Sequence, residues 1–279
     1  MAVTLLNTVI GNSNLGVETS DSVFSVLAFG ARIEFRLPAA LLPELPSPIV
    51  PTGVFDAQGP ADAVLSVRLN HTAEGDCLFE ITENGMFLGT ETSLQAAKEV
   101  IESWAQLTVA TLARELVFVH AGVVGWRNKA IVLPGRSWSG KTTLVLALVE
   151  AGADYYSDEY ALFDSEGRVH PYWRLPKLKT TPGCNVSRRL LEGVLCGPPP
   201  GAIPLGWVFI SRYEPGSSWQ PQRLSCGETL LGLLDNTIPL RRRPEESVKT
   251  LARAMTNAQG FEGVRGEAAS FAQEALALL

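Results

Sequence analysis

Short β-rich runs separated by turn signals fill the first ninety residues of the chain. The runs "SVFSVLAF" and "ARIEFRL" are interrupted at Gly30, and "CLFEITENGMFLGT" carries Asn84-Gly85 between two strand-like halves. An Asn-Gly pair between alternating hydrophobic runs is the strongest short hairpin signal, because both residues tolerate positive φ. The pattern predicts a β meander in a small β-rich N-terminal region, residues 1–92.

The hydrophobic period changes from two to about 3.6 after Thr92. Apolar side chains recur at helical spacing from Leu94 through Ile101 and Trp104 to Leu116. Such spacing places them on one face of a helix. We therefore place a boundary near residue 92 and predict a second, α/β domain over residues 93–279.

The second domain begins with two β-rich runs, 117–124 and 129–134, around the turn "GWRNK". Next come a helix in "TTLVLALVEAG" and one strand in "ADYYSDEYALFD", which the turn "SEG" ends. "GWVFISRYEPG" is predicted as a buried strand. Three helices are predicted in "GETLLGLLDNT", "PEESVKTLARAMTNA" and "EAASFAQEALALL". We expect the last helix to dock an apolar face containing Phe271 on the core.

The glycine-rich stretch "LPGRSWSGKTTL" has the spacing of a P-loop. Its glycines let backbone N–H groups converge on phosphates, and the following helix adds its positive N-terminal dipole. Lys141 would reach the β- and γ-phosphates, and the Thr142 hydroxyl would bind Mg²⁺. We expect Lys141 to face solvent when no nucleotide is bound. The predicted nucleotide-binding residues are Gly135, Arg136, Ser137, Trp138, Ser139, Gly140, Lys141, Thr142 and Thr143. A chance glycine-rich turn is the alternative, but the strand before the loop and the helix after it favour phosphate binding.

Two acidic residues and one histidine are expected close to this loop. Asp158 follows Lys141 by 17 residues, so a helix and a returning strand bring Asp158 and Glu159 back beside the phosphates. An exposed acidic turn is the alternative. His120 lies on the strand that pairs with the P-loop strand, where it could hydrogen-bond Asp158 and tune its basicity. A buried core histidine explains His120 equally well.

The triplet "RRR" at residues 241–243 stands in an acidic chain of net charge −6. One interpretation is a phosphate clamp, for which Arg243 is our candidate. The other is a solvated basic turn before a helix.

Composition and charge argue against a nucleic-acid-binding, membrane-spanning or secreted protein. With 46% hydrophobic and 19% charged residues, the chain can bury a large core. The negative net charge argues against a dedicated nucleic-acid binder. No apolar run of membrane-spanning length occurs, and no basic residue precedes the apolar start, so we expect a cytoplasmic protein without a secretory signal. The four cysteines form no CxxC pair, and we expect reduced, mostly buried thiols.

The segment "VHAGVVGWRNKAIVLPGRSWSGKTTLVLALVEAGADYYSDEYALFD" resembles the catalytic domain of the bacterial HPr kinase family. It is more closely similar to the HPr kinase-related P-loop proteins, as are "RYEPG", "LLDNT" and "RRRPEESV" further on. The resemblance extends from about His120 to about Ala254. The first ninety residues do not resemble the domain that precedes the kinase in the HPr enzymes.

The resemblance implies a mixed sheet of the phosphoenolpyruvate carboxykinase type, with ATP and Mg²⁺ as cofactors. It implies phosphate transfer to serine, with Asp158 as general base, Glu159 assisting the metal and His120 in the histidine position. The Glu-x-Arg-Gly stretch tied to phosphorolysis is missing; this region reads "HPYWRLPKLKTTPG". The departure argues against phosphorylase activity and against HPr as substrate.

The sequence therefore predicts an ATP- and Mg²⁺-dependent kinase acting on a hydroxyl of a peptide, protein or small molecule, with serine favoured. A peptide serine is one candidate, because some HPr kinase-related proteins are associated with peptide natural-product pathways. Two alternatives stay open: a nucleotide-binding regulatory or assembly protein without transfer, and a carboxykinase-like enzyme acting on a small metabolite. We expect neither nucleic acid nor membrane as a partner, and homo-oligomerisation is left open.

Overall fold

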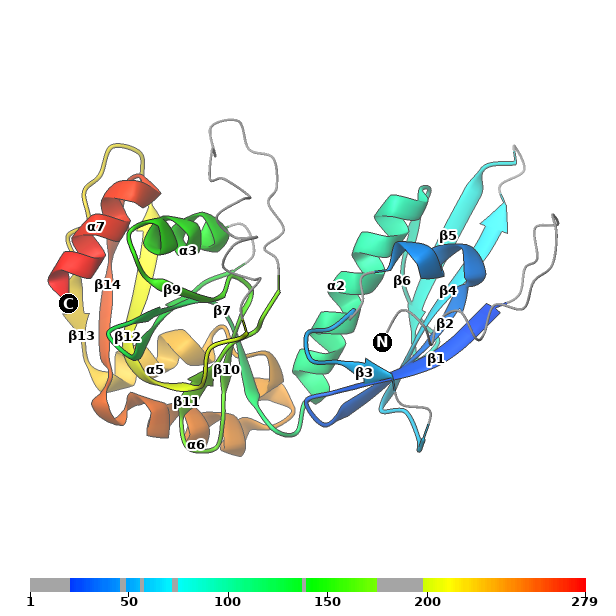
Figure 1. The fold of residues 1–279 in the computed structure, drawn as a ribbon, viewed down its shortest axis with the longest axis horizontal. Coiled ribbons are helices and arrows are strands. Elements are labelled where there is room, and N and C mark those ends of the chain that lie inside the picture. The colour runs from blue at the N-terminus through cyan, green and yellow to red at the C-terminus, as the bar shows by residue number, and fades with distance from the viewer. Residues whose placement is uncertain (1–20, 46–48, 56–57, 72–74, 137–138, 175–197) are drawn as a thin grey trace.

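The chain forms a mixed α/β protein with two mixed β-sheets, each accompanied by helices (Figure 1). The computed structural model describes residues 21–45, 49–55, 58–71, 75–136, 139–174 and 198–279. Within them are five α-helices, numbered α2, α3, α5, α6 and α7. Helix α2 lies between the two sheets in Figure 1.

The first sheet has six strands in the order β3-β1-β2-β4-β5-β6. The strands are β1 (Asp21–Ala28), β2 (Ala31–Pro38), β3 (Val54–Phe55), β4 (Ala63–His71), β5 (Cys77–Glu83) and β6 (Met86–Glu91). The 3-10 helix η1 (Ala39–Glu44) follows β2. The hairpin at Asn84-Gly85 is confirmed, with φ of 50° and 79°. A simple meander is wrong, because β2 and β4 pair in parallel through a crossover that contains η1 and β3.

Helix α2 (Leu94–Leu112) packs on this first sheet. The Ser93 hydroxyl caps it by accepting a hydrogen bond from the Ala96 amide at 3.1 Å. Its apolar face, including Ile101 and Val109, shares one core with sheet residues such as Phe35. The boundary near residue 92 stays a prediction, although the helix on its C-terminal side completes the core of the strands before it.

The second sheet has eight strands and holds the glycine-rich loop. Its order is β11-β10-β7-β8-β12-β14-β13, and β9 also pairs with β7. The strands are β7 (Val117–Trp126), β8 (Lys129–Pro134), β9 (Asp154–Ser157), β10 (Tyr160–Phe163), β11 (Arg168–His170), β12 (Ile203–Tyr213), β13 (Gln222–Leu224) and β14 (Gln259–Arg265). Strands β8, β12 and β14 are parallel neighbours. Their carboxyl ends therefore meet at one edge, where α/β proteins usually bind ligands.

Helices cover both faces of the second sheet. Helices α3 (Lys141–Glu150) and α7 (Ala268–Leu278) pack together on one face, and α5 (Cys226–Leu234) and α6 (Pro244–Ala254) lie on the other (Figure 1). The short 3-10 helices η2 (Ile238–Arg241) and η3 (Met255–Asn257) flank α6. The three C-terminal helices are confirmed, and Phe271 of α7 is buried as expected.

The predicted continuous strand over "ADYYSDEYALFD" is wrong. It breaks into β9 and β10, and Asp158 and Glu159 occupy the break. The Ser157 hydroxyl shapes this break by accepting hydrogen bonds from the amides of Glu159 and Tyr160, at 3.1 and 3.0 Å. Both acidic side chains thus sit on a short bend that the strands on either side hold in place.

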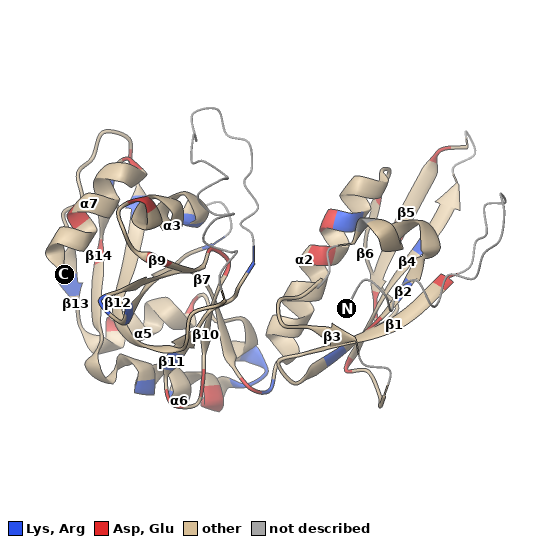
Figure 2. Ribbon diagram, in the orientation of Figure 1, with Lys and Arg blue, Asp and Glu red and all other residues tan. Residues whose placement is uncertain are grey.

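Charged side chains are distributed over the whole described surface (Figure 2). Acidic and basic positions are interspersed over both sheets and their helices (Figure 2). Among the helices that the structure describes, none has the length and apolar character that crossing a bilayer requires. Cys77 and Cys226 are free but exposed, so the expectation of burial is wrong for these two. Cys184 and Cys196 lie outside the described residues.

Candidate functional site

The glycine-rich loop connects the end of β8 to the start of α3, as the sequence predicts. Gly140 is the N-cap of α3 and has φ of +86°, a left-handed conformation that favours glycine. At Gly135 a side chain would meet the Ser139 hydroxyl at 2.7 Å, so the loop returns closely on itself. Arg136, Ser139 and Thr143 are exposed along it. The predicted residues Ser137 and Trp138 lie outside the described part of the chain.

Lys141 is buried within the loop, with only 7% of its surface exposed. Its ammonium donates hydrogen bonds to the carbonyl oxygens of Gly135 and Arg136, both at 2.9 Å. Burial lowers the pKa of Lys141, although Glu159 and Asp158 act in the opposite direction. The expectation of a solvent-facing lysine is therefore wrong. Phosphate oxygens would have to take the place of these carbonyls as partners of the ammonium.

Asp158 lies against the first turn of α3. Its carboxylate accepts a hydrogen bond from the Thr142 hydroxyl at 2.9 Å and lies 3.3 Å from the Tyr155 hydroxyl. The side chain is buried, and burial raises the pKa of Asp158 despite the Thr142 hydrogen bond and the charge of Arg174. This contact confirms the expected return of Asp158 to the loop.

Glu159 is more open and faces His120. The Nε2 atom of His120 lies 3.6 Å from the Oε1 atom of Glu159, whose side chain is 39% exposed. Burial alone would raise the pKa of Glu159, but His120, Arg174 and Lys141 outweigh it and lower the pKa. His120 therefore faces Glu159 and not Asp158, the partner that the sequence left open. Strand β7 places His120 opposite Tyr160, which directly follows Glu159.

The paired oxygens of Thr142 and Asp158 suit a magnesium ion bound together with phosphates. Within the described residues, no group of three or more His, Cys, Asp or Glu side chains could hold a metal on its own. Magnesium usually takes only one or two carboxylates and completes its shell with water and substrate phosphate. A carboxylate in contact with the hydroxyl that follows the loop lysine meets that requirement.

Arg174 brings a positive charge to the acidic pair and was missed by sequence reasoning. Its guanidinium donates to Gln106 of α2 and lies 3.5 Å from Glu102 of the same helix. Its charge opposes the effect of burial on the pKa of both Asp158 and Glu159. The stretch "HPYWRLPKLKTTPG" that contains it leaves the described residues at position 175.

Arg265, at the end of β14, touches the glycine-rich loop and was also missed. It is buried, and its Nη2 atom lies 3.3 Å from the carbonyl oxygen of Ser139. Its guanidinium carbon lies 5.2 Å from the centre of the Tyr213 ring, a cation–π contact. The strand order brings Arg265 to the loop, and the sequence contains no signal for that order.

We expect Arg265→Met to weaken both the fold and nucleotide binding. The free energy of unfolding should fall by about 1–3 kcal/mol, because the Ser139 carbonyl loses a charged donor. Arg212→Met is the matched control, because Arg212 is exposed and loses only an ion pair in which its Nη2 atom lies 3.5 Å from Oε2 of Glu214. This variant should change the free energy of unfolding by less than about 0.5 kcal/mol. Urea unfolding and ATP calorimetry measure both effects. Equal behaviour of the two variants would contradict the role of Arg265 in holding the loop.

Arg243 does not act as the predicted phosphate clamp in this arrangement. Its guanidinium donates to the backbone oxygen of Ala113, just after α2, and to the carboxylate of Glu246, with one bond of 2.7 Å. The bond to Ala113 joins the start of α6 to the end of α2, and the bonds to Glu246 lie within the first turn of α6. We therefore remove Arg243 from the candidate site.

Comparison with known proteins does not assign the chain to a family. No protein-family model matches the sequence, and neither does any curated protein. The case for a function therefore depends on the residues gathered around the glycine-rich loop.

Proposed function

We propose that the chain is an ATP- and Mg²⁺-dependent kinase of the HPr kinase-related type, which transfers the γ-phosphate to a hydroxyl. The proposal includes a P-loop kinase fold of the phosphoenolpyruvate carboxykinase type for the second sheet and its helices. One observation carries it. The loop lysine, the hydroxyl of Thr142, two carboxylates and one imidazole converge at the carboxyl end of β8. A protein that only binds nucleotide needs no second carboxylate with its own imidazole.

We assign the two carboxylates to different tasks. Asp158, bonded to Thr142, would hold Mg²⁺ together with that hydroxyl, as P-loop proteins pair a loop Ser or Thr with an Asp. Glu159, more open and facing His120, would act as the general base. This assignment exchanges the roles that the resemblance to HPr kinases implies for these two positions.

The chain's own groups supply the remaining requirements for transfer. Backbone N–H groups of the loop and the N-terminus of α3 would bind the phosphates, with Lys141 on the β- and γ-phosphates. Mg²⁺ bound with ATP would neutralise phosphate charge. Glu159 would accept the proton of the acceptor hydroxyl as its oxygen bonds to the γ-phosphorus. The bond to the β–γ bridging oxygen would break, and ADP would leave with that oxygen.

The assignment of Asp158 predicts that ATP binds more tightly with Mg²⁺ than with EDTA, and that Asp158→Asn removes most of this difference. We expect a loss of about 10- to 100-fold in apparent Mg²⁺ affinity, as for other removed partners of bound metals. Thr142→Ala should act in the same direction. Asp154→Asn, which changes an exposed aspartate at the start of β9, is the control. Titration calorimetry in both buffers measures the effect, and equal ATP affinity in both for the wild type would exclude the metal site.

Transfer itself is tested with [γ-³²P]ATP and a pool of Ser-containing peptides and small hydroxyl compounds. Labelled product that depends on Mg²⁺ would support a kinase. Tight Mg²⁺-ATP binding with no labelled product from any acceptor class would favour the regulatory alternative.

A further inference from the structure

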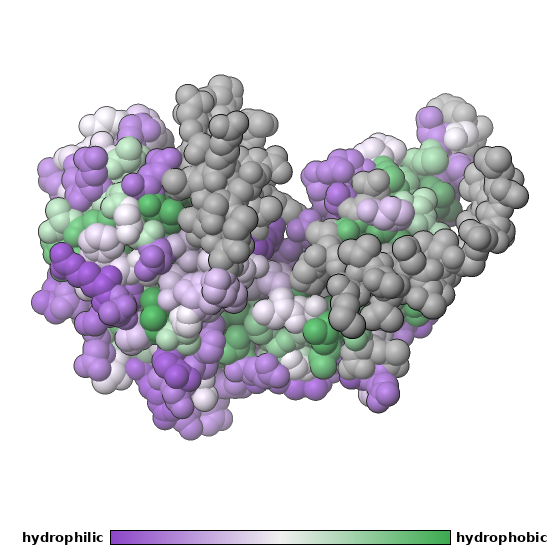
Figure 3. Space-filling model, in the orientation of Figure 1, coloured by the Kyte–Doolittle hydropathy of each residue, from purple (hydrophilic) through white to green (hydrophobic). Residues whose placement is uncertain are grey.

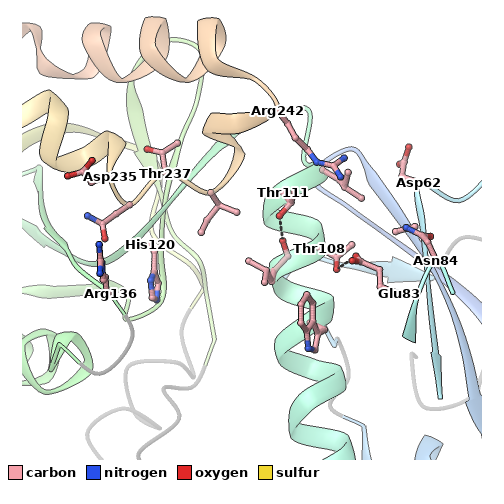
Figure 4. A pocket seen from close by; sticks show the side chains of 16 residues that line it. Asp62, Glu83, Asn84, Thr108, Thr111, His120, Arg136, Asp235, Thr237 and Arg242 are labelled. Atoms are coloured by element: carbon pink, nitrogen blue, oxygen red, sulfur yellow. Dashed lines mark hydrogen bonds between the residues drawn. The ribbon is translucent and has the colours of Figure 1, made fainter. Parts of the chain in front are cut away.

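A cavity of about 510 Å³ lies between the first sheet with its helix α2 and the second sheet. Asn84 of the first unit, Trp104 and Thr108 of α2, and His120 and Arg242 of the second unit line it. Figure 4 shows these walls facing one another. On the described surface, hydrophilic and hydrophobic residues are mixed over both units (Figure 3). The volume falls within the range of about 300–1,000 Å³ found for small-ligand sites.

One end of this cavity reaches the candidate site. His120 and Arg136 both line it, and Figure 4 shows them side by side. His120 is fixed there because its amide donates to the Asn236 carbonyl at 2.7 Å, and its carbonyl lies 3.3 Å from the Gly135 amide. A molecule in the cavity would therefore meet the imidazole that faces Glu159 next to the phosphate loop.

Two acidic groups of the wall have partners, whereas the carboxylate of Asp235 makes no hydrogen bond or ion pair within the described residues. Asp62 is paired with Arg114, and Glu83 accepts a hydrogen bond from the Thr108 hydroxyl at 2.7 Å. The two arginines of the wall are Arg136 and Arg242. Across the described part of the chain, neither guanidinium makes a hydrogen bond or an ion pair. Each thus offers donors to a ligand.

The two arginines stand at different ends of the cavity. Arg136 belongs to the glycine-rich loop, where phosphates would satisfy it. Arg242 follows η2, which packs against α2, and Figure 4 shows its guanidinium beside that helix near Thr111. An anionic group bound by Arg242 would therefore belong to the acceptor and not to the nucleotide.

We infer that this cavity binds the phosphate acceptor and that Arg242 recognises a carboxylate of that acceptor. The inference rests on the kinase function proposed above. The acceptor is a compound with a hydroxyl at the His120 end and a carboxylate at the Arg242 end. A free hydroxy acid and a seryl peptide with a nearby acidic group both have this chemistry.

Phosphorylated products test the inference without knowledge of the natural acceptor. The small-molecule arm compares O-phosphoserine with O-phosphoethanolamine, which lacks the carboxylate. The peptide arm compares Ac-pSer-Asp-NH₂ and Ac-pSer-Gly-Asp-NH₂ with their Asn counterparts. Each is titrated by calorimetry into the full chain saturated with Mg²⁺-ADP. In at least one arm, the carboxylated compound should bind about tenfold more tightly, as expected from one charge-assisted hydrogen bond.

Arg242→Gln should abolish this preference and leave Mg²⁺-ADP affinity unchanged. Arg241→Gln is the matched control, because Arg241 is exposed and does not line the cavity, and it should keep the preference. A preference that survives in Arg242→Gln, or no preference in either arm of the wild type, would overturn the inference alone. Failure of the wild type to bind Mg²⁺-ADP would overturn the kinase proposal and this inference with it.

Discussion

Glu159→Gln is expected to lower the rate of phosphoryl transfer by about 100- to 10,000-fold, the usual effect of removing a general base. ATP and Mg²⁺ should still bind, because Thr142, Asp158 and Lys141 keep their contacts. The fold should also be retained, since the Glu159 side chain is partly exposed. Single-turnover transfer from [γ-³²P]ATP to the best acceptor of the pool measures the rate, and calorimetry measures binding.

Glu166→Gln is the control for this variant, because Glu166 is exposed and pairs with Arg168 at 3.2 Å on the turn after β10. It should transfer phosphate at the wild-type rate. The reverse assignment makes the opposite prediction. If Glu159→Gln loses the Mg²⁺ effect while Asp158→Asn keeps it and loses transfer, the roles implied by the resemblance hold and ours are exchanged.

His120 allows a second check on the same base. If its imidazole supports Glu159, His120→Ala should slow transfer in the wild type but cost almost nothing in Glu159→Gln, because residues that act as a unit are not additive. Transfer rates of the two single variants and the double variant give the coupling. An equal cost of His120→Ala in both backgrounds would return His120 to a purely structural role.

Lys141→Ala is expected to reduce ATP affinity by about 100-fold or more, the loss of at least one strong charged contact to phosphate. The structure also predicts a cost to the fold. Because two loop carbonyls lose their donor, the free energy of unfolding should fall by about 1–2 kcal/mol. Calorimetry and urea unfolding measure the two quantities.

Lys249→Ala serves as the control for Lys141→Ala, since Lys249 is an exposed lysine on α6. It should change neither quantity measurably. Wild-type ATP affinity in Lys141→Ala would remove the glycine-rich loop from the nucleotide site. A large stability loss without loss of ATP affinity would assign Lys141 to the fold alone.

Local patterns of the sequence predict the elements well. The Asn84-Gly85 hairpin, the "GWRNK" turn and the helix after Lys141 depend on residues that are neighbours along the chain. The parallel pairing of β2 with β4 was not predicted, because strand partners far apart in sequence leave no local period. Strand β14 was not predicted, because its seven residues include two glycines and show no clear strand pattern.

The candidate site was predictable in its parts but not in its pairings. The P-loop spacing and the 17-residue interval identified Lys141, Thr142 and the acidic pair. Which acid meets Thr142 and which meets His120 depends on the bend between β9 and β10, where one residue of offset exchanges their directions. Arg265 and Arg174 arrive through strand order and through contacts with α2, which no spacing in the sequence reveals.

Arg174 makes the acidity of the site depend on the N-terminal unit. Helix α2 holds the guanidinium of Arg174 and is packed on the first sheet. The charge of Arg174 acts on the carboxyls of Asp158 and Glu159. If α2 moved away with Arg174, burial would be less opposed and the pKa of both carboxyls would rise. Glu159, the proposed base, and Asp158, the proposed metal ligand, would then be protonated at a higher pH. The position of the first sheet is thus thermodynamically linked to proton uptake at the second, and the linkage acts equally in both directions.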